Sequence, residues 1–96
     1  MPETISLNTI LVATKQNVSC ALGEEAAILH MRSGVYYGLD PVGAYVWRLL
    51  AQPRSVKDLQ AAILQEYEVE PEKCESDLVV LLQRLRAEGL IEIRSE

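Results

Sequence analysis

The residues of this chain that could support catalysis or hold a metal are few and far apart. The sequence contains two cysteines, Cys20 and Cys74, and a single histidine, His30. A structural zinc site needs about four such ligands, and the two cysteines do not form a C-x-x-C pair. No glycine-rich phosphate loop or nucleophile elbow accompanies them. We therefore expect no catalytic residues, no cofactor and no metal. We interpret the cysteines as reduced thiols that fill small apolar spaces, with a redox or catalytic thiol as the alternative.

A second set of residues suits the binding of an extended peptide. Residues 35–39 are apolar and aromatic, and they lead without a linker into Asp40-Pro41. Farther along, two apolar and two charged residues recur at the spacing of one helix flank. If the strand lies at a sheet edge, a peptide can pair with its backbone and rest apolar side chains on that flank. The candidate peptide-binding residues are Val35, Tyr36, Tyr37, Gly38 and Leu39 on the strand, and Asp77, Val80, Leu81 and Arg84 on the helix.

Several of these side chains also have a purely structural interpretation. Tyr37 and Trp47 are interpreted as packing residues, from the hairpin pattern and from a helix stripe. Tyr36 falls on the other face of its strand, where an aromatic side chain serves either packing or a contact surface. Val80 and Leu81 either line the groove or pack against the strands of this same chain.

The candidate strand needs neighbours, and three earlier segments have the pattern of strands. Thr9–Ala13 is a short apolar run. Apolar residues alternate over residues 18–22, which predicts a half-buried strand. Residues 26–32 form the next candidate and lead into Ser33-Gly34, a two-residue hairpin signal.

That hairpin signal predicts a register. A two-residue loop pairs Arg32 with Val35 and Ile28 with Leu39, and directly opposed residues share a face. The face assigned to the core holds Ile28, His30, Val35, Tyr37 and Leu39. The other face holds Leu29, Met31, Tyr36 and Gly38, and a slip of one residue would exchange the two faces.

The second half of the chain carries the start and stop signals of helices. Asp40 can cap a helix that begins at Pro41, and Ser55 with Asp58 has the spacing of a capping box. Gly89 is a natural helix end. The predicted helices cover residues 41–50, 55–67 and 71–89, and residues 90–93 are predicted to add a short strand.

Strands followed by helices predict an α+β fold. We expect an N-terminal three-stranded antiparallel sheet followed by a three-helix bundle, similar to a winged helix-turn-helix. We expect one domain over residues 1–96 with its core at about 17–93. Residues 1–16 are then an N-terminal extension, for which an extra strand and a partner contact are the alternatives.

Charge and hydropathy narrow the classes of partner. The formal net charge is −5, and the leading half of the third helix carries Glu72, Glu75 and Asp77 against Lys73. DNA phosphates would repel that surface, so we expect no nucleic-acid partner, with a winged-helix transcription regulator kept as the alternative from another class. The sequence has no signal peptide and no run long enough to cross a bilayer, which predicts a cytoplasmic protein without a membrane partner.

The strand-to-helix segment also carries a family resemblance. Residues 35–50, Val-Tyr-Tyr-Gly-Leu-Asp-Pro-Val-Gly-Ala-Tyr-Val-Trp-Arg-Leu-Leu, resemble the signature of PqqD-like proteins. The later order of residues 55–59, Tyr67, residues 74–82 and residues 86–91 is similar as well. These proteins are the peptide-recognition elements of pathways that make ribosomally synthesised, modified peptides (RiPPs). The resemblance covers about residues 17–93.

The resemblance implies a binding function. It implies that the leader peptide of a precursor is added as a strand between the third strand and the third helix, without catalysis by this chain. The precursor would then be delivered to a separate maturation enzyme. The chain looks most like the discrete recognition proteins of lasso-peptide pathways, where that enzyme is a leader peptidase. A PqqD-type chaperone for a radical-SAM maturase is the nearest alternative.

Overall fold

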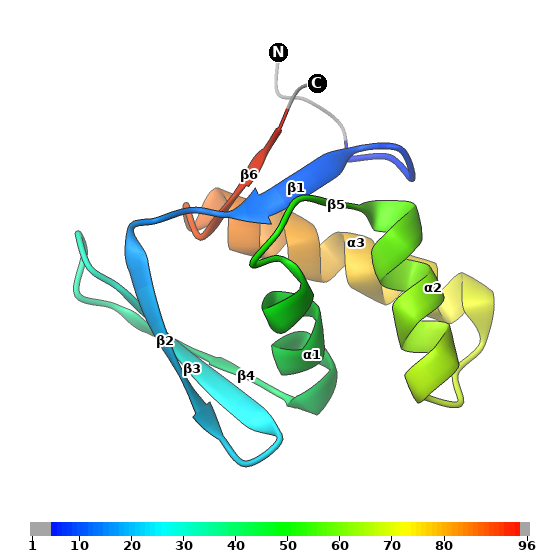
Figure 1. Ribbon diagram of the computed structural model, residues 1–96, viewed down its shortest axis with the longest axis horizontal. Helices are drawn as coiled ribbons and strands as arrows, with labels where there is room; N and C mark the ends of the chain where they lie inside the picture. Colours follow the sequence, from blue (N-terminus) through cyan, green and yellow to red (C-terminus); the bar gives the residue numbers. More distant parts are fainter. Residues whose placement is uncertain (1–4, 95–96) are drawn as a thin grey trace.

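The computed structural model describes residues 5–94, which form two small sheets and three helices (Figure 1). The first sheet is antiparallel and has the order β2-β3-β4. Its strands are β2 (Asn17–Leu22), β3 (Glu25–His30) and β4 (Tyr36–Leu39). Three helices follow in the sequence, so the predicted α+β class, with a three-stranded sheet before three helices, is confirmed.

The β3–β4 hairpin has a wider loop than the sequence predicted. Ile28 pairs with Tyr37, and the His30 N–H donates to the Val35 carbonyl at 3.0 Å, so Met31–Gly34 form the loop. The predicted pairing of Ile28 with Leu39 is therefore wrong by two residues. The physical reason is that His30 binds two amides of the loop. Its carbonyl accepts from the Gly34 N–H, and its Nδ1 accepts from the Ser33 N–H.

The shift in register leaves the predicted faces intact, because side chains alternate with a period of two. Ile28 and Leu39 are buried on one face, and Tyr36 is 71% exposed on the other. Tyr37 is half-buried and packs against the core, as predicted.

Strand β2 is less buried than its alternating pattern predicted. Val18 and Leu22 are 55% and 59% exposed, and Cys20 is exposed with them. The prediction of a half-buried strand, and of Cys20 in an apolar space, is therefore wrong. Alternation shows which residues share a face but not which face is covered. In β2 the small residues, such as Ser19, face inward opposite buried Ile28.

Local hydrogen bonds fix the starts of the first two helices. Asp40 caps α1 (Pro41–Leu49) by accepting from the Gly43 N–H at 2.8 Å. Ser55 caps α2 (Val56–Glu66) by accepting from the Asp58 N–H at 3.0 Å. The third helix, α3, spans Pro71–Ala87 and is followed by Gly89 at a φ of 75°. A positive φ at this position suits glycine, which ends helices without steric cost.

The second sheet joins the two ends of the described chain. Its order is β5-β1-β6, formed by β5 (Arg54–Ser55), β1 (Ile10–Ala13) and β6 (Ile91–Ile93). β1 is the central strand and pairs antiparallel with both neighbours. Leu11 on β1 is fully buried, so this segment contributes to the core.

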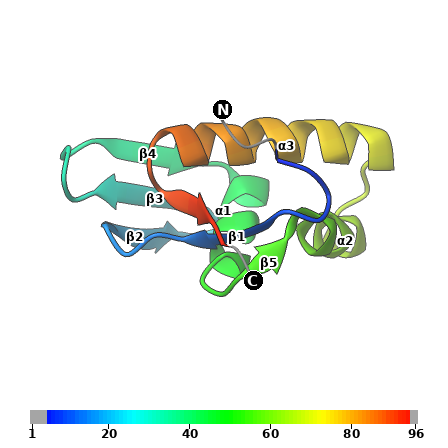
Figure 2. The ribbon, with the colours of Figure 1, turned by 90° about the horizontal axis from the view of Figure 1, so that it is seen from above.

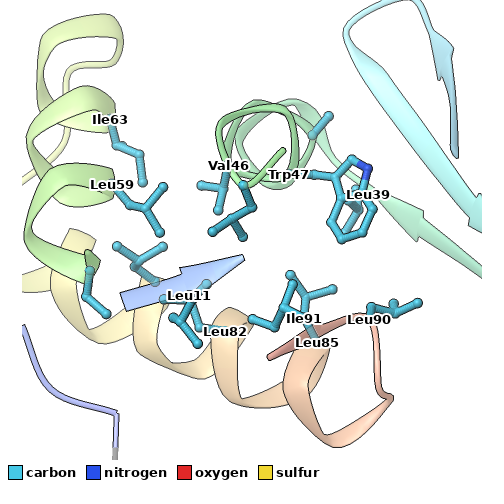
Figure 3. Close-up of a cluster of buried hydrophobic side chains, with 14 of the residues drawn as sticks. Leu11, Leu39, Val46, Trp47, Leu59, Ile63, Leu82, Leu85, Leu90 and Ile91 are labelled. Carbon is cyan, nitrogen blue, oxygen red and sulfur yellow. The ribbon is translucent and has the colours of Figure 1, made fainter. Parts of the chain in front are cut away.

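One hydrophobic core lies between the three helices, β1 and β6 (Figure 3). Leu11, Val46, Leu59 and Leu82 contribute fully buried side chains. Trp47 is 7% exposed and links α1 to the first sheet beside Leu39 (Figure 3). The prediction that Trp47 is a packing residue is thus confirmed. Between residues 5 and 94, no helix combines the length and apolarity needed to span a membrane.

Candidate functional site

Strand β4 forms one edge of the first sheet and faces α3. Figure 2 shows β2, β3 and β4 side by side, with α3 running along the β4 side of the sheet. Within residues 5–94, β4 pairs only with β3. Its other edge is therefore available for main-chain hydrogen bonds.

The hydrogen-bond pattern identifies which backbone groups of β4 are free. The carbonyl of Val35 accepts from His30, so the backbone groups of Val35, Tyr37 and Leu39 point toward β3. The N–H and C=O of Tyr36 and Gly38 alternate with them and point toward the open edge. A Cβ at Gly38 would meet nothing within 4 Å, so the backbone there is uncovered.

One face of α3 lies opposite this edge. Asp77 and Leu81 line a pocket together with Asp40, the residue that follows β4. One and two turns later, Arg84 and Glu88 lie near Tyr37, since both charges act on its hydroxyl. Positions 77, 81, 84 and 88 share one side of a helix. The pocket at Asp40 and the Tyr37–Glu88 contact thus lie at the two ends of this face of α3. We call this α3 face, together with the open edge of β4, the groove.

A hydrogen bond joins β4 to the end of α3. The Tyr37 hydroxyl donates to Glu88 Oε2 at 2.6 Å. This bond raises the pKa of Tyr37 above its ordinary value of 10.0; desolvation and the Glu88 charge add to the rise, and Arg84 opposes it. Because only the neutral phenol can donate, the bond is present below pH 10 and is lost as the pH rises through the raised pKa.

The pocket at the other end of the groove has a volume of about 270 Å³. This is slightly below the range of about 300–1,000 Å³ that is usual for small-molecule and cofactor sites, and it suits one apolar or aromatic side chain. A Lys73–Asp77 ion pair of 3.2 Å stands among the lining residues, and both side chains are exposed. The apolar lining includes Val42, Val46, Ile63, Val69, Cys74 and Leu78.

Cys74 gives the pocket a weakly reactive thiol. Burial raises the pKa of Cys74, and the negative charge of Asp77 adds to the rise. The thiol therefore stays protonated at neutral pH and is a poor nucleophile. Its burial agrees with the prediction of a packed thiol. In the described part of the chain, no group of three or more His, Cys, Asp or Glu residues could hold a metal ion.

The structure brings most of the predicted strand residues to the groove in different roles. Tyr36 and Gly38 offer backbone groups at the edge, and Tyr37 reaches α3. Val35 lies just before β4 and is 45% exposed. Leu39 is the exception, because its side chain is buried in the core and its backbone faces β3.

The predicted helix residues lie on one flank of α3. Asp77 and Arg84 are exposed, and Val80, at 63%, is the exposed large apolar side chain of this helix. Leu81 is half-buried because it both lines the pocket and packs against the core. Leu81 therefore fits both predicted alternatives, since it lines the groove and also packs within this chain.

The residues that close the pocket were not predicted from the sequence. They include Val42 at the start of α1, Val69 in the α2–α3 turn and Lys73 on α3. Val69 could have been singled out from the sequence, because it is an apolar residue between Glu68 and Glu70 that belongs to no apolar helix stripe. It is 42% exposed.

Comparison with known proteins identifies the family. The family model for coenzyme PQQ synthesis protein D (PqqD) matches residues 25–91, which include β4 and α3. The chain belongs to the PqqD family. A search of curated protein sequences found no match.

Two solved structures share the fold of this PqqD-family chain. "TbiB1 in complex with the TbiA(beta) leader peptide" is 32% identical over 88% of this chain and 99% of that one, with a TM-score of 0.79. "Lasso peptide synthetase B1 complexed with the leader peptide" is 24% identical over 85% of this chain and 96% of that one, with a TM-score of 0.75.

Proposed function

We propose that this chain binds the leader peptide of a RiPP precursor, of the lasso-peptide class, as a strand added to β4. The observation that carries the proposal is the open edge of β4 beside a helix face with an apolar pocket. The likeness to TbiB1, solved with a leader peptide, supports it.

Main-chain pairing supplies a part of the affinity that does not depend on sequence. Tyr36 and Gly38 together offer two N–H groups and two carbonyls to the guest strand. A typical hydrogen bond contributes a net 0.5–1.5 kcal/mol or so, so these bonds alone give weak binding. Selectivity then comes from the guest's side chains.

The pocket selects a side chain and thereby fixes the register. Burying one large apolar side chain contributes about 1.5–3 kcal/mol, which is comparable to several backbone bonds. Guest side chains alternate, so one set points toward the α3 flank with Val80, Leu81 and Arg84, and the other set points outward beside Tyr36. Once an apolar leader residue occupies the pocket near Asp77, the positions of the other leader residues along β4 are fixed.

The chain acts by binding and not by catalysis. The pocket thiol at Cys74 is kept protonated, and the groove offers a peptide hydrogen bonds and apolar contacts. The work is delivery of the precursor in the cytoplasm to a maturation enzyme, a leader peptidase. The match to the PqqD family model favours, as the second candidate, delivery to a radical-SAM maturase.

Titration of the isotope-labelled protein with a synthetic leader, followed by NMR, tests the proposal. We expect the largest amide shifts at Tyr36 and Gly38 and along α3 at Val80 and Leu81. A leader of the same composition in scrambled order is the control and should give no saturable shifts. Saturable shifts confined to β2, or no binding of the cognate leader, would contradict the proposal.

A further inference from the structure

Strand β2 forms the second edge of the first sheet, on the side away from α3 (Figure 2). The Met31 N–H donates to the Gln16 carbonyl at 3.0 Å, which fixes the alternation along β2. The even-numbered residues bond to β3, so the N–H and C=O groups of Asn17, Ser19 and Ala21 point to the open edge. Among the described residues, no strand pairs with this edge.

This edge lacks the features with which proteins usually prevent edge pairing. Such features are charged side chains, proline, bulges and very short strands. β2 has six residues, Asn-Val-Ser-Cys-Ala-Leu, without a charge or a proline. All except Asn17 are exposed. A strand of this kind is a template for another strand.

We propose that β2 pairs with β2 of a second copy of this chain, antiparallel and across a two-fold axis at Ser19. In this register Ser19 lies opposite its own copy, Asn17 lies opposite Ala21, and Val18 lies opposite Cys20. A two-fold axis requires the same strand on both sides, and an antiparallel strand pair satisfies that condition. The two three-stranded sheets then form one continuous sheet.

The side chains of β2 fit this arrangement on both faces. Inward, Asn17 and Ser19 border a hollow of about 350 Å³ with Trp47, Arg48 and Ala51, so the small inward side chains of the second copy have room. Outward, the exposed apolar side chains of Val18, Cys20 and Leu22 continue into the same row of the partner strand.

Charge supports a second copy as the occupant. Lys15 precedes β2, whereas Glu24 and Glu25 follow it. The two-fold register places Lys15 of one copy beside the Gly23–Glu24 turn of the other, twice. Within one copy, positions 15 and 24 are about 30 Å apart along an extended strand. Lys15 makes no hydrogen bond or ion pair with any residue from 5 to 94.

The assembly leaves the leader site open. β4 is the opposite edge of the sheet from β2, so each copy keeps its groove. The proposal is therefore independent of the proposed function, and the two can fail separately.

Sedimentation equilibrium of the full chain tests the pairing. An interface built from one strand pair is small, so the protein should be loaded between roughly 10 µM and 1 mM. We expect the mass to rise from 10.7 kDa toward twice that value. A mass of 10.7 kDa at every concentration would overturn the proposal.

Two sets of variants locate the interface. Ser19→Pro removes an edge N–H but no bond to β3, and should remain a monomer, while Ser19→Ala keeps the N–H and should still dimerise. Lys15→Glu and Glu24→Lys should each weaken the dimer several-fold, and the double variant should restore it. The β2 register would be refuted if folded Ser19→Pro still dimerised. It would also be refuted if the Lys15→Glu/Glu24→Lys double variant dimerised as weakly as the single variants.

Circular dichroism shows whether Ser19→Pro folds, and the charge-swap set decides the question if it does not. Leader titration of the monomeric Ser19→Pro variant should give the wild-type affinity. A loss of leader binding in that variant would contradict the independence of the two edges.

Discussion

Gly38 presents its backbone groups to the open edge of β4, and nothing lies within 4 Å of the position of a Cβ there. Its N–H points away from β3, so Gly38→Pro should remove a donor for the guest strand without removing a β3–β4 bond. We expect leader affinity to fall about tenfold or more, since one lost backbone bond and a misplaced strand cost at least about 1.4 kcal/mol. Calorimetric titration measures this loss.

Gly38→Ala is the matched control. It keeps the N–H and places a Cβ where nothing lies within 4 Å, so leader affinity and unfolding should stay close to wild type. Equal leader affinities for the folded Pro and Ala variants would exclude strand addition at this edge.

Tyr37 provides a pH-dependent contact at the other end of the groove. Its pKa is raised chiefly by the hydrogen bond to Glu88, so the neutral phenol is the form that the fold stabilises. Tyr37→Phe should destabilise the protein near neutral pH, and this difference should disappear as the pH rises through the raised pKa.

The titration of the phenolate absorbance checks the direction. In the wild type Tyr37 should ionise above the ordinary value of 10.0, and Tyr37→Phe should lack this ionisation. Glu88→Gln removes the carboxylate and should bring that ionisation back toward its ordinary range. An unchanged tyrosine titration in Glu88→Gln would show that the bond does not form in solution.

Elements whose ends depend on neighbouring residues were predictable from the sequence. The Asp40 and Ser55 caps act within three residues, and the helices begin where those side chains indicated. The β3–β4 register was not predictable in the same way, because the His30 side chain and carbonyl bind the loop amides and widen the turn. The exposure of β2 depends on what covers the sheet, which alternation does not specify.

The cap at Asp40 has two roles that substitution can separate. Asp40→Ala removes the acceptor for the Gly43 N–H and should lower the free energy of unfolding by about 0.5–2 kcal/mol. Asp40→Asn keeps an acceptor and should retain most of that stability while removing a charge from the pocket. Urea denaturation measures both, and equal losses for Ala and Asn would contradict the capping role.

At the scale of the whole molecule, β1 holds distant parts of the chain together. Leu11 is fully buried, and the strand pairs with β5 and β6. Leu11→Ala should therefore lower the free energy of unfolding by about 2–5 kcal/mol, a large part of the stability of a small domain. Leu7→Ala, at a residue that is 41% exposed, is the control and should cost much less. Similar urea midpoints for the two variants would contradict a structural role for β1.

The strand and the helix that border the candidate groove were predictable from the sequence, but the pocket was not. The strand at residues 36–39 and the flank of α3 could be predicted because each follows a local pattern. The pocket could not, because it forms only where the start of α1, Ile63 of α2, the α2–α3 turn and α3 meet. Contacts between residues so far apart in sequence leave no periodic trace.

The pairing of β1 with β6 has a practical consequence for how this domain can be attached to others. The Arg94 N–H donates to the Ile10 carbonyl at 2.8 Å, so the last described residue lies beside β1, five residues from the first described one. Ile10 and Arg94 lie at the second sheet, not at the one that contains β4. An enzyme fused in frame through either connection, or one that carries this unit as an insert between two of its own segments, would keep the guest channel unobstructed.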